Sequence, residues 1–302
     1  MSLKKIWLKI FDKDKYRDLK NFERKKINLD NYHSNIYKKI LEIRENIERK
    51  KELSLIHSGH LGDVIYSLPV IKELSKNHKC NLYIQINKPM PVKYSNHPSG
   101  NVYLDKRIVN LFLPLLKCQN FLNSANIYNN ENIDVDLDLF RQIPINIRFH
   151  STRWYSHITG IPIDMEKSFL EVKSHDSVKN KIVIVRSPRY RNDFINYKFL
   201  SNIKDIICVG LESEFEDLKK EIKNLEYYNC KDFLEMAEII KASKFFIGNE
   251  CFAYSIAEGL KVPRLLEASP DFPVIFPVGK NAYDFYHQIH FEMLFKKLYK
   301  YK

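Results

Sequence analysis

The chain has 302 residues, of which 44% are hydrophobic and 28% charged, as expected for a folded globular protein of two ordinary domains. Its formal net charge of +12 favours anionic partners such as nucleotide phosphates, nucleic acid or an acidic membrane surface. Five scattered cysteines without a C-x-x-C pair argue against a zinc site and favour a reducing, cytoplasmic location. No apolar run is long enough to predict a membrane span, and the charged first residues do not predict a signal peptide.

The first 50 residues are predicted to form a helical arm. From residue 3 to residue 11 the apolar side chains fall on one helical face, and lysines surround that face. Either residues 1–15 make a peripheral contact with an anionic membrane, or the face packs on its own domain. A polar turn is expected at 30–33, and a second amphipathic helix follows it. The apolar face comprises Leu3, Ile6, Trp7, Ile10 and Phe11.

A glycine-containing turn joins the first predicted strand, at 53–56, to the first long helix. Glycines in such a turn allow a positive φ and let a ligand approach the backbone, while the helix N-terminus offers free N–H groups to an anion. We therefore expect this loop to line a ligand cleft, with Asp63 either starting the helix or acting as a catalytic group. The loop residues are Ser58, Gly59, His60 and Gly62.

The turn also resembles a known motif. The run Gly-His-Leu-Gly-Asp at 59–63, followed by Ser-Leu-Pro at 67–69, is similar to the opening motif of the heptosyltransferase family of GT-B glycosyltransferases. The resemblance implies that this motif begins the first of two Rossmann-like domains and that Asp63 is the catalytic base.

Residues 134–140 alternate acidic and apolar side chains and are predicted to form a strand. They contain two overlapping D-x-D triplets, formed by Asp134, Asp136 and Asp138. In metal-dependent glycosyltransferases of another fold, such a triplet holds a divalent ion. We favour the simpler interpretation, a strand with acids on one face, and expect no metal site. Upstream, residues 108–116 fit either a helix or a strand.

The second half alternates strands and helices, which predicts a second parallel sheet. Its first strand, 181–185, leads into a loop with Ser187, Arg189 and Arg191, and guanidinium groups suit phosphate oxygens. The alternative is a solvated basic turn. A strand at 206–210 ends in Gly210, and a helix is predicted over 212–225.

Residues 247–263 resemble the donor segment of the same family, whose pattern runs roughly G-N-D-S-G-P-x-H-L-A-A-A-L-G-x-P. The chain agrees at Gly248, Asn249, Ala257, Leu260 and Pro263, and it departs at Glu250, Phe252, Ala253 and Ser255. Backbone N–H groups of 249–255, at a helix N-terminus, can hold a diphosphate. The expected donor residues are Ser187, Arg189, Arg191, Gly210, Gly248, Asn249, Glu250, Cys251, Ser255 and Glu267.

Two expectations concern the end of the chain. Glu267, at a strand end, either binds ribose hydroxyls or faces solvent. Residues 281–302 are predicted to form a helix with Phe285, Ile289, Leu294 and Leu298 facing inward. The resemblance implies that this helix crosses back to the first domain.

Together these patterns predict an α/β, GT-B-like protein with two Rossmann-like domains facing a cleft. The expected parts are the arm (1–50), an acceptor domain (51–172) and a nucleotide-sugar donor domain (173–302). The resemblance implies metal-independent, cofactor-free transfer of a sugar from a nucleotide-diphosphate sugar to a glycan or lipid-linked acceptor. The alternatives are a non-catalytic nucleotide-sugar or glycan-binding protein, or a sugar-nucleotide epimerase or hydrolase on the same fold. No nucleic-acid partner is expected, because no nucleic-acid module matches.

Overall fold

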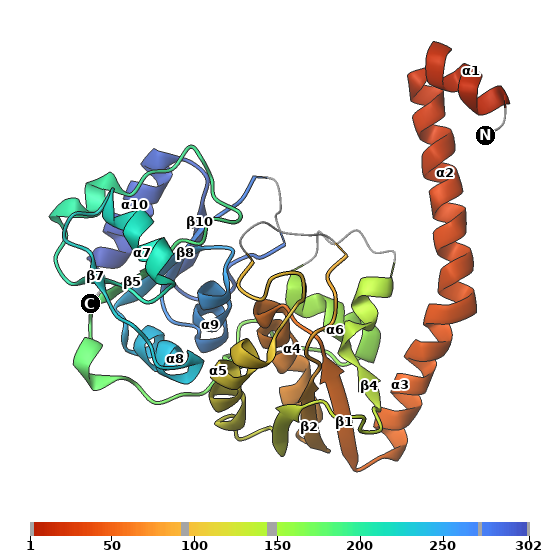
Figure 1. Ribbon diagram of the computed structural model, residues 1–302, viewed down its shortest axis with the longest axis horizontal. Helices are drawn as coiled ribbons and strands as arrows, with labels where there is room; N and C mark the ends of the chain where they lie inside the picture. The colour runs from red at the N-terminus through yellow and green to blue at the C-terminus, as the bar shows by residue number, and fades with distance from the viewer. Residues whose placement is uncertain (1–2, 92–96, 144–149, 271–273, 301–302) are drawn as a thin grey trace.

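The computed structural model, which describes residues 3–91, 97–143, 150–270 and 274–300, has two parallel β-sheets with helices around them (Figure 1). The first sheet is fully parallel in the order β3-β2-β1-β4. Leu55 at its centre lies level with Leu82 on one side and Val135 on the other. The strands are β1 (Glu52–His57), β2 (Lys79–Ile84), β3 (Ser124–Ile127) and β4 (Val135–Asp136). The helices of this half are α4 (Leu61–Leu74), α5 (Lys106–Lys117) and α6 (Ser151–Thr159).

The second sheet is also fully parallel, in the order β10-β9-β8-β5-β6-β7. Its central strands are almost wholly buried, as expected for a parallel sheet covered on both faces. The strands are β5 (Ile182–Val185), β6 (Ile206–Cys208), β7 (Glu226–Tyr227), β8 (Phe245–Asn249), β9 (Arg264–Glu267) and β10 (Ala282–Phe285). The helices are α7 (Glu212–Lys219), α8 (Phe233–Ala242), α9 (Phe252–Leu260) and α10 (Gln288–Tyr299).

The two halves share one apolar core. Helix α4 packs on α9, and α5 packs on α8, so the helices between the sheets form the contact between the halves (Figure 1). Phe252 lies in this contact, with its ring 5.7 Å from that of Phe112 and 4.7 Å from that of Phe233. The segment that joins the halves is held to α9, because the amides of Phe169 and Leu170 both donate to the carbonyl of Gly259.

Several predicted elements need correction. The alternating run 134–140 forms only the two-residue β4 and then a 3-10 helix (Leu137–Gln142), because the Asp136 carboxylate accepts the amide of Asp138 and starts a helical turn. The undecided segment 108–116 is helical, within α5, and the helix expected over 212–225 ends at Lys219.

The C-terminal prediction was partly wrong. Residues 282–285 add a strand, β10, to the sheet, so the helix begins only at Gln288. Its inward face is formed by Phe291, Phe295 and Leu298, whereas Ile289 is 76% exposed. These side chains join the apolar cluster of the second sheet, so α10 covers that sheet and does not cross to the first half.

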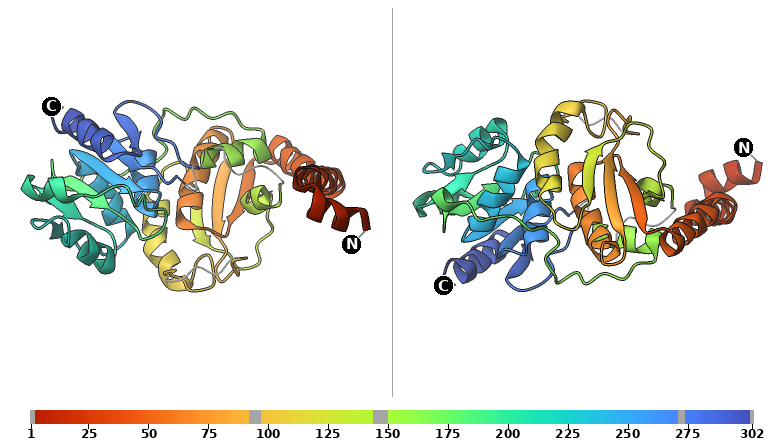
Figure 2. Two further views of the ribbon diagram at one scale, coloured as in Figure 1. Left: turned by 90° about the horizontal axis from the view of Figure 1, so that it is seen from above. Right: turned by 90° about the horizontal axis from the view of Figure 1, so that it is seen from below.

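The arm was predicted correctly as helical, but it is more continuous than expected. It contains α1 (Leu3–Phe11), α2 (Lys13–Asn31), a π-helical segment (Tyr32–Ile36) and α3 (Tyr37–Arg49). The turn expected at 30–33 is absent, because α2 continues directly into the π-helical segment, and residues 13–49 contain no glycine or proline to interrupt it. Figures 1 and 2 show α1 and α2 projecting from the body, to which α3 is packed.

Candidate functional site

The turn between β1 and α4 brings Asp63 to the carboxyl end of the first sheet. Gly59 makes the turn with φ of +98°, and a Cβ at this position would lie 2.6 Å from Cγ of Leu104. Only glycine fits both the conformation and the space. Asp63 follows in the first turn of α4, with 22% of its side chain exposed.

An ion pair holds the Asp63 carboxylate. Nη2 of Arg141 lies 2.7 Å from Oδ2 of Asp63, and the same guanidinium contacts the carbonyl of Gly59. The guanidinium also lies over two rings, 4.7 Å from Tyr103 and 4.5 Å from Phe140. Among the described residues, the hydrogen bonds of Asp63 use only Oδ2 of the carboxylate. Oδ1 accepts no hydrogen bond from these residues.

A buried histidine supports the backbone of Asp63. The amide of Gly59 donates to Nδ1 of His57 at 2.9 Å, so Nε2 carries the proton and donates to the Tyr155 hydroxyl at 2.9 Å. Tyr155 in turn donates to the carbonyl of Asp63 at 2.8 Å. Burial lowers the pKa of His57 to about 4, so the ring is neutral and the chain of donors is fixed.

The acids of the D-x-D triplets serve the protein itself. Asp134 pairs with Lys50, and its other oxygen accepts the amide of Ser54 at 2.9 Å. Asp138 is buried and accepts from the Ser58 amide (3.0 Å), Lys88 (3.1 Å) and Arg141 (2.8 Å). Burial disfavours its ionised form, but the neighbouring cations and amide hold the pKa of Asp138 below its ordinary value. Within the described ranges, no three His, Cys, Asp or Glu side chains group as metal ligands.

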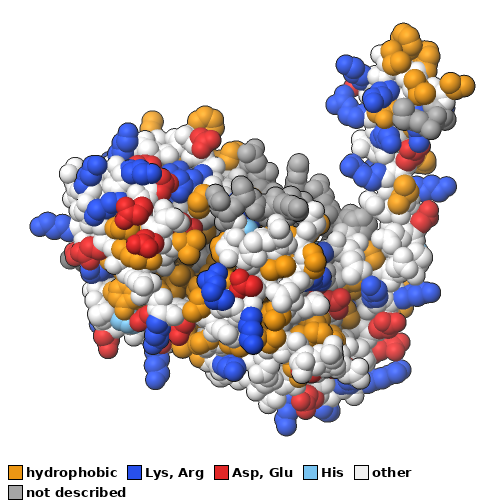
Figure 3. Space-filling view, in the orientation of Figure 1, with side chains coloured by type: hydrophobic (Ala, Val, Ile, Leu, Met, Phe, Trp, Pro, Cys, Tyr) orange, Lys and Arg blue, Asp and Glu red, His pale blue; other side chains and the backbone are white. Residues whose placement is uncertain are grey.

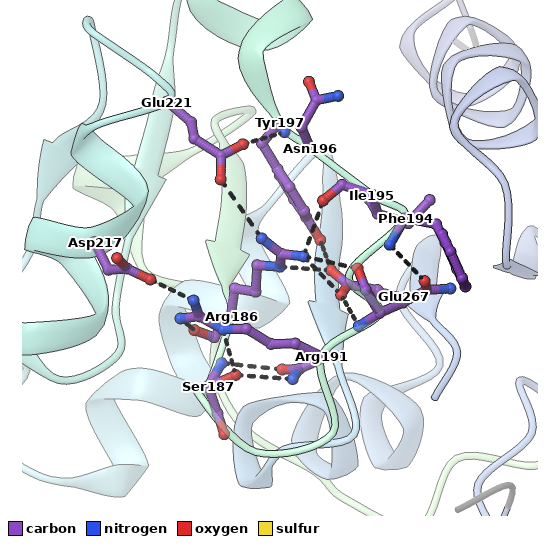
Figure 4. A network of polar contacts seen from close by, with 12 residues as sticks. Arg186, Ser187, Arg191, Phe194, Ile195, Asn196, Tyr197, Asp217, Glu221 and Glu267 are labelled. Atoms are coloured by element: carbon purple, nitrogen blue, oxygen red, sulfur yellow. Dashed lines mark hydrogen bonds and ion pairs between the residues drawn. The ribbon is translucent and has the colours of Figure 1, made fainter. Parts of the chain in front are cut away.

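Glu267 forms a buried ion pair at the end of β9 (Figure 4). Its carboxylate accepts from Nε and Nη2 of Arg186 at 2.7 and 2.9 Å, from the Tyr197 hydroxyl at 2.9 Å and from the Asn192 amide at 2.7 Å. The side chain has no exposed surface. Both expectations for Glu267, a ribose ligand and a solvated acid, are therefore corrected: its contacts hold the loop after β5.

The same loop uses two more predicted donor residues as braces. Arg191 pairs with Asp217 and donates to the carbonyls of Arg186 and Ser187, as Figure 4 shows. Asn249, fully buried at the end of β8, accepts the Ser187 amide at 3.0 Å and donates to the carbonyls of Ser187 and Arg189. The predicted basic loop is therefore held in place by hydrogen bonds, and the backbone of Arg189 is one of the groups held.

The two halves meet where the two sequence motifs come together. A Cβ on Gly62 would lie 3.8 Å from the hydroxyl oxygen of Ser255, which itself donates to the Phe252 carbonyl at 2.6 Å. Ser255, one of the expected donor residues, is fully buried in this contact. Burial lowers the pKa of His60 to about 3, with Arg189 as the next contributor.

The start of α9 carries an unusual carboxyl group. Glu250 is only 4% exposed, and neither carboxylate oxygen has a hydrogen-bond partner among the described residues. Burial raises its pKa to about 8, against a smaller lowering by the backbone of Ser269, which does not reach the carboxylate with hydrogen-bond geometry. Cys251, at the N-cap of α9, is a partly exposed free thiol whose pKa burial raises to about 12. A group kept protonated near neutral pH is thus placed beside a helix N-terminus.

The two predicted donor glycines have packing roles. A Cβ on Gly248 would lie 2.8 Å from the carbonyl of Val185 on the neighbouring strand, and one on Gly210 would collide with the Glu214 carboxylate. Both glycines therefore permit close approach within the second half. Gly210 lies just after β6 and is partly exposed.

Comparisons with known proteins bear on the fold. No protein-family model and no curated protein matches the chain. Solved structures of GT-B-like glycosyltransferases do match it. A family 9 glycosyltransferase from Veillonella parvula superposes with a TM-score of 0.52 at 11% identity, over 83% of this chain and 89% of that one. The heptosyltransferase WaaC of E. coli, solved with ADP, superposes with a TM-score of 0.56 at 9% identity, over 82% of this chain and 99% of that one. The predicted fold class, α/β and GT-B-like, is confirmed.

Sequence reasoning missed the groups that surround Asp63. The sequence patterns do not single out His57, Lys88, Arg141 or Tyr155. One signal was available: Arg141 follows Asp138 by three residues, the spacing of side-chain neighbours on a helical turn. Because residues 134–140 were predicted as a strand, this helical spacing was not considered.

Proposed function

We propose that the protein is a glycosyltransferase that moves a sugar from a nucleotide-diphosphate sugar to a glycan or lipid-linked acceptor, without a metal ion or cofactor. The observation that carries the proposal is the convergence of the two motifs. Gly62, next to Asp63, lies against Ser255 of α9, where α4 packs on α9. The turn with the candidate base and the helix start that would bind phosphates therefore come from opposite halves to one place.

In this proposal the acceptor hydroxyl approaches Oδ1 of Asp63. Its oxygen bonds to the anomeric carbon as the bond from that carbon to the phosphate oxygen breaks, and its proton passes to Asp63. Arg141 holds the other carboxylate oxygen, and Tyr155 holds the Asp63 carbonyl, so the base has a fixed orientation. Positioning of this kind lowers the entropic part of the barrier.

The leaving nucleoside diphosphate would be bound from the second half. Arg189, in the braced loop, and the backbone N–H groups at the start of α9 suit two phosphates. Glu250, whose carboxyl is protonated at neutral pH, would donate a hydrogen bond to the donor. The solved structure of WaaC with ADP supports a nucleotide in this kind of fold.

The ion pair of Asp63 also favours a second candidate, a non-catalytic nucleotide-sugar or glycan-binding protein. A carboxylate that is permanently paired with Arg141 would position a ligand hydroxyl without removing its proton. Turnover separates the two candidates, because only the enzyme releases a nucleoside diphosphate in the presence of an acceptor. For the enzyme, peripheral contact with an anionic membrane through residues 1–15 is part of the proposal.

The test of the donor site is Arg189→Ala, with Lys204→Ala as control. Lys204 is exposed in the same half but follows η4 (Lys198–Asn202), away from the loop. Calorimetry should show that Arg189→Ala weakens a nucleoside diphosphate about 10- to 100-fold, the value of a charged hydrogen bond, and leaves the bare nucleoside unchanged. Equal weakening of both ligands, or the same effect from Lys204→Ala, would remove Arg189 from the phosphate site.

A further inference from the structure

The tip of the arm has a defined orientation. Helix α1 folds back on α2, with Leu8 buried between them and Lys5 paired with Glu23 at 2.6 Å. The turn between the helices is set by Asp12, whose carboxylate caps α2 by accepting the amide of Lys15 at 3.0 Å. One face of α1 is therefore fixed against the arm, and the opposite face points outward.

The outward face of α1 is apolar, large and exposed. Trp7 is 57% exposed and Phe11 70%, with their rings 5.6 Å apart. Residues 3–15 contain five lysines and only two aspartates. Figure 3 shows apolar and basic side chains together at the tip of the arm. The face is formed by Leu3, Ile6, Trp7, Ile10 and Phe11. The lysines are Lys4, Lys9 and Lys13, with Lys5 and Lys15, which pair with Glu23 and Asp12.

The arm projects past the functional edge of the first sheet. Lys39, early in α3, donates to Gln142, which follows the carboxyl end of β4. Asn46, late in α3, donates to the carbonyl of Asp134, just before β4 begins. Helix α3 is therefore antiparallel to the strands, and α2 continues beyond their carboxyl ends (Figure 1). Asp63, in the first turn of the helix that follows β1, lies at the same ends. The 19 residues of α2 carry α1 about 28 Å further.

We propose that α1 lies in the interface of an anionic phospholipid membrane and that α2 is a spacer. The spacer would hold the carboxyl edge of the first sheet, with Asp63, toward the bilayer. The identity of the acceptor rests on the proposed function: an enzyme held in this way reaches a membrane-attached acceptor. The membrane contact itself does not depend on catalysis. Apolar side chains enter the interface while the surrounding lysines meet anionic headgroups.

The charge of the tip favours a membrane over a second copy of the chain. Two identical faces brought together would place the surrounding lysines of both copies side by side, which is electrostatically unfavourable. An anionic bilayer offers the opposite charge around an apolar interior. Among the described residues no helix has the length and apolarity to span a bilayer, so the contact proposed is a surface one.

The experiment is co-sedimentation of the full chain with phosphatidylcholine vesicles, with and without phosphatidylglycerol. The wild type should bind only the anionic vesicles and should be released by salt. Trp7→Glu should weaken binding at least about tenfold, and so should Lys4→Glu with Lys9→Glu. Ile289→Glu is the matched control, because Ile289 is also an exposed apolar side chain, at 76% against 57% for Trp7, but lies on α10. It should bind as the wild type does.

A second readout uses the two tryptophans of the chain. Brominated anionic lipids should quench Trp7 and leave Trp154 bright, because Trp154 is only 5% exposed within the first half. Trp7→Phe should remove the quenching and keep most of the binding. Quenching that persists in Trp7→Phe would place another part of the protein in the membrane and overturn the proposal.

The membrane contact and the proposed function can fail separately. Absence of vesicle binding by a chain that still binds nucleoside diphosphate would overturn the membrane contact alone. Vesicle binding by a chain that binds no nucleotide would leave the contact standing and overturn the proposed function. A dimer in sedimentation velocity that Trp7→Glu abolishes, without vesicle binding, would assign the face to a second copy.

Discussion

Glu267→Gln should destabilise the protein and not act as a donor-site mutation. In the wild type four hydrogen bonds converge on the Glu267 carboxylate. The substitution removes the negative charge opposite the buried Arg186 and places an NH2 group against the N–H and O–H donors that the carboxylate accepts from. Removing one partner of a buried ion pair costs about 3–5 kcal/mol. Arg186 keeps a contact with Glu221 at 3.6 Å, so the lower end, about 3 kcal/mol, is expected.

The assay is equilibrium unfolding in urea, followed by circular dichroism, with Asp217→Asn as control. Asp217 pairs with Arg191 in the same loop, but 39% of its side chain is exposed, so this loss should cost no more than about 1 kcal/mol. A Glu267→Gln protein with an unchanged unfolding midpoint and weakened nucleoside binding would refute the argument. Such a result would support Glu267 as a ribose ligand instead.

Two further predictions concern pH and metal. Because His57 has a folded pKa of about 4 and an ordinary value of 6.5, the unfolded chain takes up a proton that the folded chain excludes. His57 alone should therefore lower stability by about 1.5 kcal/mol as pH falls from about 6.5 to about 5. The urea unfolding midpoint should fall with pH over this range, and His57→Gln should reduce that fall. A variant whose midpoint falls as steeply as that of the wild type would contradict the prediction. The affinity for the nucleotide sugar should be equal in EDTA and in Mg²⁺, because protein groups already bind the carboxylates of Asp134, Asp136 and Asp138. If calorimetry shows that binding needs a metal ion, these carboxylates become candidate ligands of that ion.

Local patterns predicted the framework well. The apolar strands and the glycine turn at 59–62 depend on neighbouring residues, so their positions followed from the sequence. The heptosyltransferase resemblance supplied the order of the two halves, and the structural comparisons confirm the fold class. Side-chain partners could not be predicted in this way, because they come from distant segments: Arg141 reaches Asp63 across 78 residues and Arg186 reaches Glu267 across 81.

Two failures have a common physical cause. Asp136 and Glu267 were judged by their strand patterns, which say which face a side chain takes but not what lies there. Asp136 caps a helical turn and ends the strand, and Glu267 pairs with the guanidinium of Arg186, which follows β5 in the same sheet. The exposed face of α1 shows the converse: its pattern predicted a helix correctly, and only the structure shows that the body does not cover it.

The central claim is that Asp63 is the general base, and the kcat of Asp63→Asn tests it most directly. Asparagine keeps the size of the side chain and its place at the start of α4, so folding and donor binding should remain, while sugar transfer slows roughly 10²–10⁴-fold. The loss should fall on kcat, because proton removal develops only in the transition state. A variant that binds donor normally and turns over at the wild-type rate would contradict the account.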